Sequence, residues 1–583
     1  MKRFLQYAKP YRVAFLLGPL CMIVESVGEI LLPFLLQLIY GRVEAPTSSS
    51  SADIGYILLI AGAMFLLSLC MMAGGVGGAY FGSRASVGFA ADLRTDIYKK
   101  VQSFSFANID RFHPGSLITR LTNDVTQLQN FVNMLLRMCL RAPVMLVGAL
   151  VMAIALRPDL SVILLISVPL LAGLQYLIIR VGFPRFRNMQ ARIDRLNETV
   201  QESLTNVRVV KSFVREEHEK EKFAEANDRL MEYNLKAMNV MLFTQPMMML
   251  IMNGTMLAVL LIGGRQVAAS AMEAATLATF LTYITQILFS LMMMTMLFMN
   301  SSRALASAGR IREVMEEEIS LTDEGAAHPE KKVARGEIEL RDVSFRYYKN
   351  SEDPVLSHVS LKIGAGETVG IIGSTGCGKT TLVSLIPRLY DADSGSVLID
   401  GVDVRDYSLH ELRDGIGMVL QKNVLFSGKI SDNLRWGDED ATEEEMRAAA
   451  TAAQADGFIS SFPGGYDAAI AQGGQNVSGG QKQRLCLARA LLRHPKILIL
   501  DDSTSAVDTA TEARIRQMLA SELPDTTKII IAQRIGSVQN ADRIVVMDGG
   551  RVTGIGTHEE LLRENQEYRE IYESQQGGKE AAV

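Results

Sequence analysis

A glycine-rich stretch contains the first side chains suited to phosphate chemistry. The sequence GSTGCGKT fits the spacing G-x-x-x-x-G-K-[ST], with an apolar run before it and an apolar helical pattern after it. We expect the backbone N–H groups to bind the phosphates of ATP, Lys379 to meet the β- and γ-phosphates, and Thr380 to bind Mg²⁺. The predicted nucleotide-binding residues here are Gly373, Ser374, Thr375, Gly376, Cys377, Gly378, Lys379, Thr380 and Thr381.

An acidic partner for this loop follows a fully apolar run, ILIL, at residues 497–500. Asp501 comes directly after that run, so it is expected at the end of a buried strand. A carboxylate in this place can hold Mg²⁺ through water while the phosphate loop binds the nucleotide. The sequence therefore predicts a nucleotide site with ATP and Mg²⁺ as its ligands.

The elements that would position these residues form an α/β domain from Glu337 onward. Short β-rich runs such as TVGIIG, GSVLIDG, ILILDD, KIIIAQ and RIVVMDGG alternate with Gly-rich turns and helical patterns. The predicted boundaries are 1–310 for a membrane domain, 311–336 for a linker and 337–583 for the α/β domain.

The first 300 residues have a different pattern. Six apolar stretches, at 13–40, 54–83, 132–156, 160–182, 239–263 and 275–299, are each long enough to cross a bilayer as a helix. The long segments between them and the N-terminus are rich in Arg and Lys, which places them in the cytoplasm. We therefore predict a bacterial multi-pass protein of the cytoplasmic membrane, with both termini and the α/β domain cytoplasmic.

Composition supports a chain that is part membrane protein and part soluble protein. Hydrophobic residues make up 48% of the 583 residues, and the formal net charge at pH 7 is −5. The acidic balance gives no argument for a nucleic-acid partner. Five cysteines at irregular spacing predict neither a disulfide framework nor a zinc site.

A second motif lies shortly before Asp501. The sequence VSGGQ at residues 477–481 resembles the signature motif of ATP-binding cassette (ABC) proteins. With six spans and a phosphate loop in the same order, the whole chain resembles a half-size ABC exporter. The resemblance implies an all-α six-helix transmembrane domain followed by an α/β P-loop nucleotide-binding domain.

The resemblance also implies roles for individual residues. Tyr347, or less favourably Tyr348, would stack on adenine, and Gln421 would touch Mg²⁺ and the attacking water. Asp508 would link the two nucleotide sites of a dimer. The signature residues would press on the γ-phosphate bound by another subunit; they are Ser478, Gly479, Gly480 and Gln481. Two cytoplasmic segments, 108–125 and 201–217, resemble those that dock on nucleotide-binding domains.

The chain departs from the family pattern at two positions of the same site. Asp502 stands where the family has the glutamate that polarises water, and Gln533 stands where it has a histidine. Because both changes weaken hydrolysis while the binding residues remain, we predict a heterodimer with a second half-transporter that has the intact Glu and His. A homodimer with two slow sites is the alternative. Gln472 and Gly473 also replace an acidic residue and an arginine that are usual before the signature.

The cargo is less constrained than the ATP site. Glu25 and Glu29 lie four residues apart in the first span, and Arg137 and Arg141 lie four apart in the third. Either acid and base pair as a structural network, or Glu25 and Glu29 form a site for cationic substrates. Methionine-rich fifth and sixth spans are compatible with a promiscuous apolar cavity.

We expect ATP-driven export of hydrophobic or amphipathic compounds by alternating access, of the multidrug type, with lipid or peptide export as alternatives. A nucleotide-regulated channel would need a longer regulatory tail than ENQEYREIYESQQGGKEAAV.

Overall fold

The fold is known from a computed structural model, which describes residues 2–44, 50–348, 353–503 and 507–580. The chain divides into two compact units. The first, Met1–Gln102 with Pro114–Glu316, is called the membrane unit below. The second, Ser103–His113 with Glu317–Val583, is called the sheet unit.

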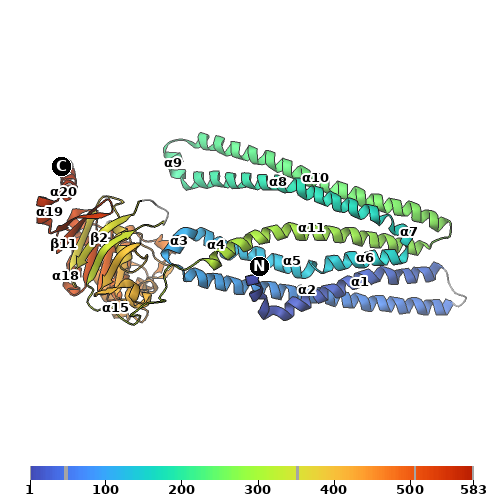
Figure 1. The fold of residues 1–583 in the computed structure, drawn as a ribbon, viewed down its shortest axis with the longest axis horizontal. Helices are drawn as coiled ribbons and strands as arrows, with labels where there is room; N and C mark the ends of the chain where they lie inside the picture. Colours follow the sequence, from blue (N-terminus) through green and yellow to red (C-terminus); the bar gives the residue numbers. More distant parts are fainter. Residues whose placement is uncertain (1, 45–49, 349–352, 504–506, 581–583) are drawn as a thin grey trace. The chain divides into compact units, whose positions relative to one another are not determined.

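Long helices make up the membrane unit (Figure 1). Among the described residues, six are long and apolar enough to cross a membrane, as the sequence predicts. Helix α1 packs along α2, and α8 packs along α10. The main helices are α1 (Arg12–Glu44), α2 (Ser50–Gln102), α5 (Val125–Met138), α6 (Arg141–Leu156), α8 (Leu164–Thr205), α10 (Glu216–Ala268) and α11 (Ala274–Glu316).

Small residues let α1 approach α2 closely. A Cβ added at Gly74 would lie 2.8 Å from the carbonyl oxygen of Cys21, so only glycine fits there without a shift. Small residues at helix contacts are the usual means of close packing in a bilayer, where the hydrophobic effect between helices is absent. The glycine-rich part of α2 thus fixes how Glu25 on α1 is presented.

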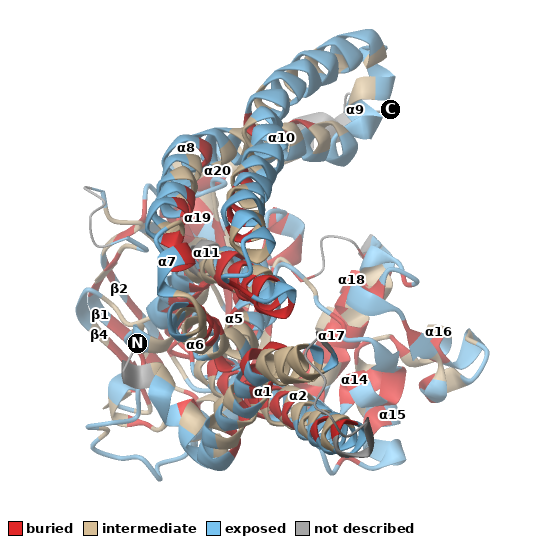
Figure 2. Cartoon of the chain, turned by 90° about the vertical axis from the view of Figure 1, so that its right-hand side faces the viewer, coloured by how far each residue is buried: buried red, intermediate tan, exposed pale blue. Residues whose placement is uncertain are grey.

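The cytoplasmic segments break at the turns that the sequence indicates. His113, at φ 53°, separates α3 (Phe106–Phe112) from α4 (Pro114–Thr119). Asn206 separates α8 from the short helix α9 (Val207–Ser212). The third span, predicted at 132–156, is confirmed within one candidate membrane span, Pro114–Leu156; it has a short interruption between α5, which ends at Met138, and α6, which begins at Arg141. Figure 2 shows α8 and α10 exposed along much of their length.

The sheet unit contains a six-stranded and a four-stranded sheet. The larger has the order β12-β11-β3-β10-β9-β6 and is parallel except at β12, while the smaller is antiparallel with the order β2-β1-β4-β5. The parallel strands are β3 (Thr368–Gly373), β6 (Ile416–Val419), β9 (Ile497–Asp501), β10 (Thr527–Ile531) and β11 (Arg543–Asp548). The others include β1 (Ile338–Phe345), β2 (Leu356–Ile363), β4 (Ser394–Ile399) and β12 (Arg551–Gly556).

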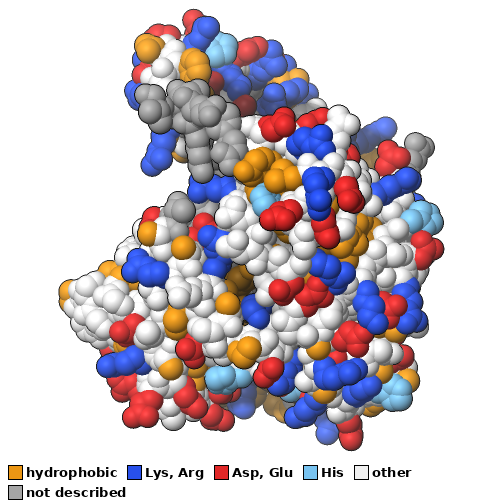
Figure 3. Space-filling model, turned by 90° about the vertical axis from the view of Figure 1, so that its left-hand side faces the viewer, with side chains coloured by type: hydrophobic (Ala, Val, Ile, Leu, Met, Phe, Trp, Pro, Cys, Tyr) orange, Lys and Arg blue, Asp and Glu red, His pale blue; other side chains and the backbone are white. Residues whose placement is uncertain are grey.

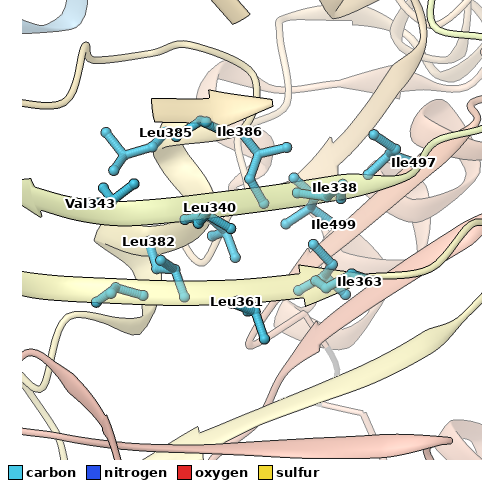
Figure 4. Close-up of a cluster of buried hydrophobic side chains, with 14 of the residues drawn as sticks. Ile338, Leu340, Val343, Leu361, Ile363, Leu382, Leu385, Ile386, Ile497 and Ile499 are labelled. Atoms are coloured by element: carbon cyan, nitrogen blue, oxygen red, sulfur yellow. The ribbon is translucent and has the colours of Figure 1, made fainter. Parts of the chain in front are cut away.

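Helix α12 (Lys379–Leu385) is anchored in the main core of the sheet unit. Leu382, Leu385 and Ile386 lie among side chains of β1, β2 and β9 (Figure 4). All three are at most 1% exposed, and burial of a leucine or isoleucine side chain contributes about 1.5–3 kcal/mol. The apolar side of α12 therefore fixes the residues at its N-terminus, where the phosphate loop ends.

The described surface is polar and mixed in charge on the face in Figure 3. Lys and Arg side chains lie among Asp and Glu side chains there, and hydrophobic side chains are scattered between them. Such a mixture is usual where a surface contacts water.

Candidate nucleotide site

The parallel sheet brings the predicted catalytic residues together at the carboxyl ends of its strands. Strands β3, β10, β9 and β6 are adjacent, so their carboxyl ends lie next to one another. The residues that follow these ends are the phosphate loop, Gln533, Asp502 and Gln421 respectively. In open α/β sheets, ligands bind outside the carboxyl ends of the strands.

The phosphate loop depends on glycine at its start. Gly373 has φ 154°, and a Cβ there would lie 2.0 Å from the carbonyl oxygen of Met547. The Nζ of Lys379 donates to the carbonyl oxygens of Gly373 (2.8 Å) and Ser374 (2.7 Å), and it lies 3.6 Å from the Sγ of Cys377. The ammonium group is thus held inside the turn. Of the remaining loop residues, Ser374, Thr375 and Gly376 are exposed, while Cys377, Gly378 and Thr381 are buried.

Asp501 lies against the start of α12. The Oγ1 of Thr380 donates to its Oδ1 (3.1 Å), and its side chain is almost fully buried, at 1% exposure. Its other oxygen, Oδ2, is buried and has no hydrogen-bond partner among the described residues. Burial raises the pKa of Asp501 above its usual 3.8, and the neighbouring Asp502 raises it further, against the hydrogen bond from Thr380 and the charge of Lys379.

These residues fit a magnesium ion bound together with phosphate. Mg²⁺ in proteins is commonly held by one or two carboxylates, with substrate phosphates and water as the other ligands. Thr380 and Asp501 would hold the ion, directly and through water, and the unpartnered Oδ2 of Asp501 suits a water ligand. The ion would supply neutralisation of the charge that develops on the phosphates.

We predict that Asp501→Asn stabilises the nucleotide-free protein. The pKa of Asp501 is raised, so its ionised form costs stability; that cost grows as the pH rises above 3.8 and is complete above the raised pKa. Removing the charge should raise the free energy of unfolding at pH 7 by about 1 kcal/mol, the scale of one unsatisfied buried group. Thermal unfolding at pH 7 without nucleotide measures this. Lower stability of the variant would show that the buried carboxylate of Asp501 does not destabilise the folded protein.

The two departures from the family pattern touch each other. The Nε2 of Gln533 donates to the Oδ2 of Asp502 (3.0 Å), and Gln421 also hydrogen-bonds the Asp502 side chain. Asp502 has φ 49°, and its backbone N–H donates to the carbonyl oxygen of Ile531 (3.0 Å). Burial raises the pKa of Asp502, while the hydrogen bond from Gln421 and the charges of Lys379 and Arg534 lower it. A carboxylate held by amides in this way is restrained rather than free to approach water.

The signature residues begin a different helix. Ser478 is the N-cap of α17 (Gly479–Leu492); its Oγ accepts from the N–H of Gln481, and the Oε1 of Gln481 accepts from the N–H of Ser478 (2.9 Å). Asp508 caps α18 (Thr509–Glu522) by accepting from the N–H of Thr511 (2.9 Å). The hydrogen bonds of both caps are local, so the structure does not join these residues to the phosphate loop of the same chain.

Before the signature, Gln472 and Gly473 lie in a short turn. The Nζ of Lys482 donates to the carbonyl oxygen of Gly473 (2.9 Å), which ties this turn to α17.

Tyr347 lies beside the phosphate-loop helix, as a residue that stacks on adenine must. Its hydroxyl is 3.0 Å from the Oγ1 of Thr381, and its side chain is half-exposed, whereas Tyr348 is 69% exposed. Its ring meets that of Tyr390 edge to face, with centroids 5.2 Å apart.

Tyr390 joins this aromatic pair to α3. Its hydroxyl donates to the Oδ2 of Asp110 (2.7 Å), and its ring centroid is 6.1 Å from that of Phe106. Sequence reasoning missed Tyr390, although the segment containing Asp110 was expected to dock on a nucleotide-binding domain. The aromatic residue in PRLYDAD, one turn beyond the phosphate-loop helix, was the available signal.

In the membrane unit, Glu25 and Glu29 share one arginine. The Nη1 of Arg141 lies 3.1 Å from the Oε1 of Glu25, and its Nη2 lies 2.7 Å from the Oε1 of Glu29. The second oxygen of each glutamate is buried and has no hydrogen-bond partner among the described residues. The pairing, in which two carboxyl groups share one guanidinium, fits the structural-network interpretation.

Comparisons with known proteins agree with this architecture. A family described as "ABC transporter transmembrane region" matches residues 15–292, and one described as "ABC transporter" matches residues 356–505. The uncharacterized ABC transporter ATP-binding protein YfiB of Bacillus subtilis is 38% identical over 99% of both chains. The ATP-dependent lipid A-core flippase of Syntrophus aciditrophicus is 32% identical over 98% of this chain and 94% of its own.

Two further similarities bear on function and fold. A B. subtilis chain provisionally named the multidrug export ATP-binding/permease protein YgaD is 34% identical over 98% of both chains. A bacterial Atm1-family ABC exporter, solved with ATP bound, superposes with a TM-score of 0.78 at 25% identity, covering 96% of this chain and 98% of that one. The chain therefore belongs to the ABC transporter family, as a half-size exporter with one transmembrane domain and one ATP-binding domain.

Proposed function

We propose that this chain is one subunit of a heterodimeric exporter whose own ATP site hydrolyses slowly. In this proposal ATP drives export of hydrophobic or amphipathic compounds across the cytoplasmic membrane by alternating access. The observation that supports it most strongly is the contact between Gln533 and Asp502. Both residues that depart from the family pattern therefore act on the same catalytic step.

The chemistry of the two side chains supports slow hydrolysis. Aspartate is one methylene shorter than glutamate, which withdraws the carboxylate by about 1 Å, and a displacement of that size can cost on the order of 100-fold in rate. Glutamine donates a hydrogen bond but cannot become cationic as histidine can. Lys379 lies within the phosphate loop and Thr380 donates to Asp501, which supports binding of ATP and Mg²⁺ at this site.

The signature segment supports a dimer. Ser478 caps the N-terminus of α17, and the positive end of a helix dipole favours an anion such as the γ-phosphate. Its hydrogen bonds are local, so we assign it to the nucleotide of a second subunit. The tip between α8 and α10 also exposes apolar side chains, Phe213 at 72% and Val214 at 81%. We propose that the partner's nucleotide-binding domain covers this tip.

The decisive experiment compares the chain alone with the chain co-expressed with the half-transporter of the adjacent gene. We expect slow ATP turnover alone, a stable complex with the second half-transporter, and fast turnover by that complex. Fast turnover by the chain alone, undiminished in Asp502→Ala, would contradict the proposal and favour a homodimer.

For the cargo, multidrug export is the leading proposal, and lipid or peptide export is the alternative. The names of YgaD and of the lipid A-core flippase support the first two of these classes. The presence of two carboxyl groups, Glu25 and Glu29, beside the single guanidinium of Arg141 favours substrates that carry a positive charge.

We predict that Glu25→Gln impairs export of cationic dyes and spares export of neutral ones. Loss of the Glu25 carboxylate should lower export of the cationic dye by about 10-fold, which corresponds to ~1.4 kcal/mol of attraction between the carboxylate and the dye. Transport into inverted vesicles with one cationic and one neutral dye measures the difference. Glu232→Gln, which removes an exposed glutamate paired with Lys236, is the matched control. Equal loss for both dyes would assign Glu25 to structure alone.

A further inference from the structure

The C-terminal helix α20 (Gln566–Glu580) holds the loop that carries Gln533. The Nε2 of Gln575 donates to the carbonyl oxygen of Gln533 (2.8 Å), and its Oε1 accepts from the N–H of Ile535 (2.9 Å). One side-chain amide therefore binds two backbone groups of the same loop. An amide with one donor side and one acceptor side is suited to such a clamp.

Helix α20 packs against the sheet unit, and this packing restrains the position of Gln575. Tyr568 is fully buried, and its hydroxyl is 2.7 Å from the Nδ1 of His558. Tyr568 belongs to an apolar cluster with Ile535, and the partly buried Ile571 and Tyr572 pack against it. Positions 568, 571, 572 and 575 follow the i, i+3, i+4, i+7 spacing of one helix face. Gln575 thus lies at the end of the face by which α20 is attached.

This loop also carries the side chain that contacts Asp502. From the backbone of Gln533 its side chain reaches the Oδ2 of Asp502 (3.0 Å). The guanidinium of Arg516 on α18 holds the same loop from the other side, by donating to the carbonyl oxygen of Gly536. The backbone is therefore fixed at both ends of a short segment, and Gln533 has little freedom to leave Asp502.

We propose that Gln575 is a positioning residue for this ATP site. Through the backbone of Gln533 and Ile535 it keeps the Gln533 amide on Asp502, so that α20 regulates turnover of the bound nucleotide. Gln575 touches neither nucleotide nor Asp502, and it acts only through the loop. The part of the proposed function on which this rests is that Asp502 and Gln533 act on bound ATP.

The experiment uses the full transporter in four forms: wild type, Gln575→Ala, Gln533→Ala and the double variant. Gln566→Ala is the matched control, because Gln566 lies on the same helix and its amide bonds only the exposed Glu570 side chain in the contacts described (2.8 Å). The first measurement is hydrogen exchange of the peptide covering residues 533–537 without nucleotide. We expect Gln575→Ala to speed exchange by about 10-fold, the effect of one to two lost hydrogen bonds.

The second measurement is single-turnover hydrolysis of ATP bound at this chain's phosphate loop. Because the Gln533 amide restrains Asp502, we expect Gln575→Ala to speed hydrolysis by about 3–10-fold, the range for a lost hydrogen bond, and to have no further effect in Gln533→Ala. An equal effect in both backgrounds, or behaviour like Gln566→Ala, overturns the proposal. Failure of the slow-site proposal would instead appear in the wild type, as turnover at the partner's rate, while the exchange result would stand.

Discussion

Asp502→Glu combined with Gln533→His is expected to raise single-turnover ATP hydrolysis at this chain's own phosphate loop by about 100-fold. Glutamate restores the reach of the carboxylate toward the attacking water, and histidine replaces the amide that now donates to Asp502. The other residues proposed for hydrolysis lie close by, since Thr380 donates to Asp501 and Gln421 hydrogen-bonds the Asp502 side chain. Rapid-quench measurement with the partner's site inactivated isolates this site.

Each single variant is the control for the pair. Because the two side chains touch, their effects on the hydrolysis rate should not be additive. We expect the rate gain of the double variant to exceed the product of the gains of the two single variants. An unchanged rate in the double variant, with ATP still bound, would mean that these two residues do not limit hydrolysis here. The slow-site proposal would then have lost its chemical basis.

Lys379→Ala is expected to weaken ATP binding at this site by about 100-fold, or ~2.7 kcal/mol, as for loss of a charged partner of phosphate. The ammonium group is held within the loop by the carbonyl oxygens of Gly373 and Ser374, so its loss removes the positive charge from the phosphate loop itself. Binding of a fluorescent ATP analogue with the partner's phosphate loop disabled measures the loss.

Lys362→Ala serves as its control, since Lys362 pairs with Glu337 on the surface of the same unit. Both variants remove one lysine, so a general effect of net charge should appear equally in both. Retained affinity in Lys379→Ala would contradict the assignment of the phosphate loop.

Much of the fold could be predicted because its signals are local. Apolar runs of adequate length predict the six spans, and β-rich runs before Gly-rich turns predict β3, β9, β10 and β11. Strand β6 escaped prediction because it has only four residues, Ile416–Val419, with a glycine inside. Strand β2 escaped because the alternation in LSHVSLKI is broken by two successive polar residues, Ser357 and His358, where His358 has φ 54°.

The site could be predicted as a set of residues but not as a set of contacts. Motifs place Lys379, Asp501 and Gln533 after successive strands, and the parallel register of β9 and β10, with Ile531 opposite Asp501, then brings Gln533 near Asp502. Tyr390 and Gln575 depend on packing between distant segments, which no local pattern encodes. The sequence left Arg137 and Arg141 equivalent, and the structure pairs Arg141 with Glu25.

The path of the chain between the two units has a mechanical consequence. Because α3 belongs to the sheet unit, the chain passes between units at three places: after Gln102, after His113 and after Glu316. Within the sheet unit, hydrogen bonds join α3 to the residues that follow α11. The Nδ2 of Asn108 donates to the Oε1 of Glu317 (3.1 Å) and to the carbonyl oxygen of Glu318 (2.9 Å). A displacement of the ATP-binding domain would therefore load α2, α4 and α11 together. The two units are therefore connected by three chain passages, and cutting the linker alone would leave the other two intact.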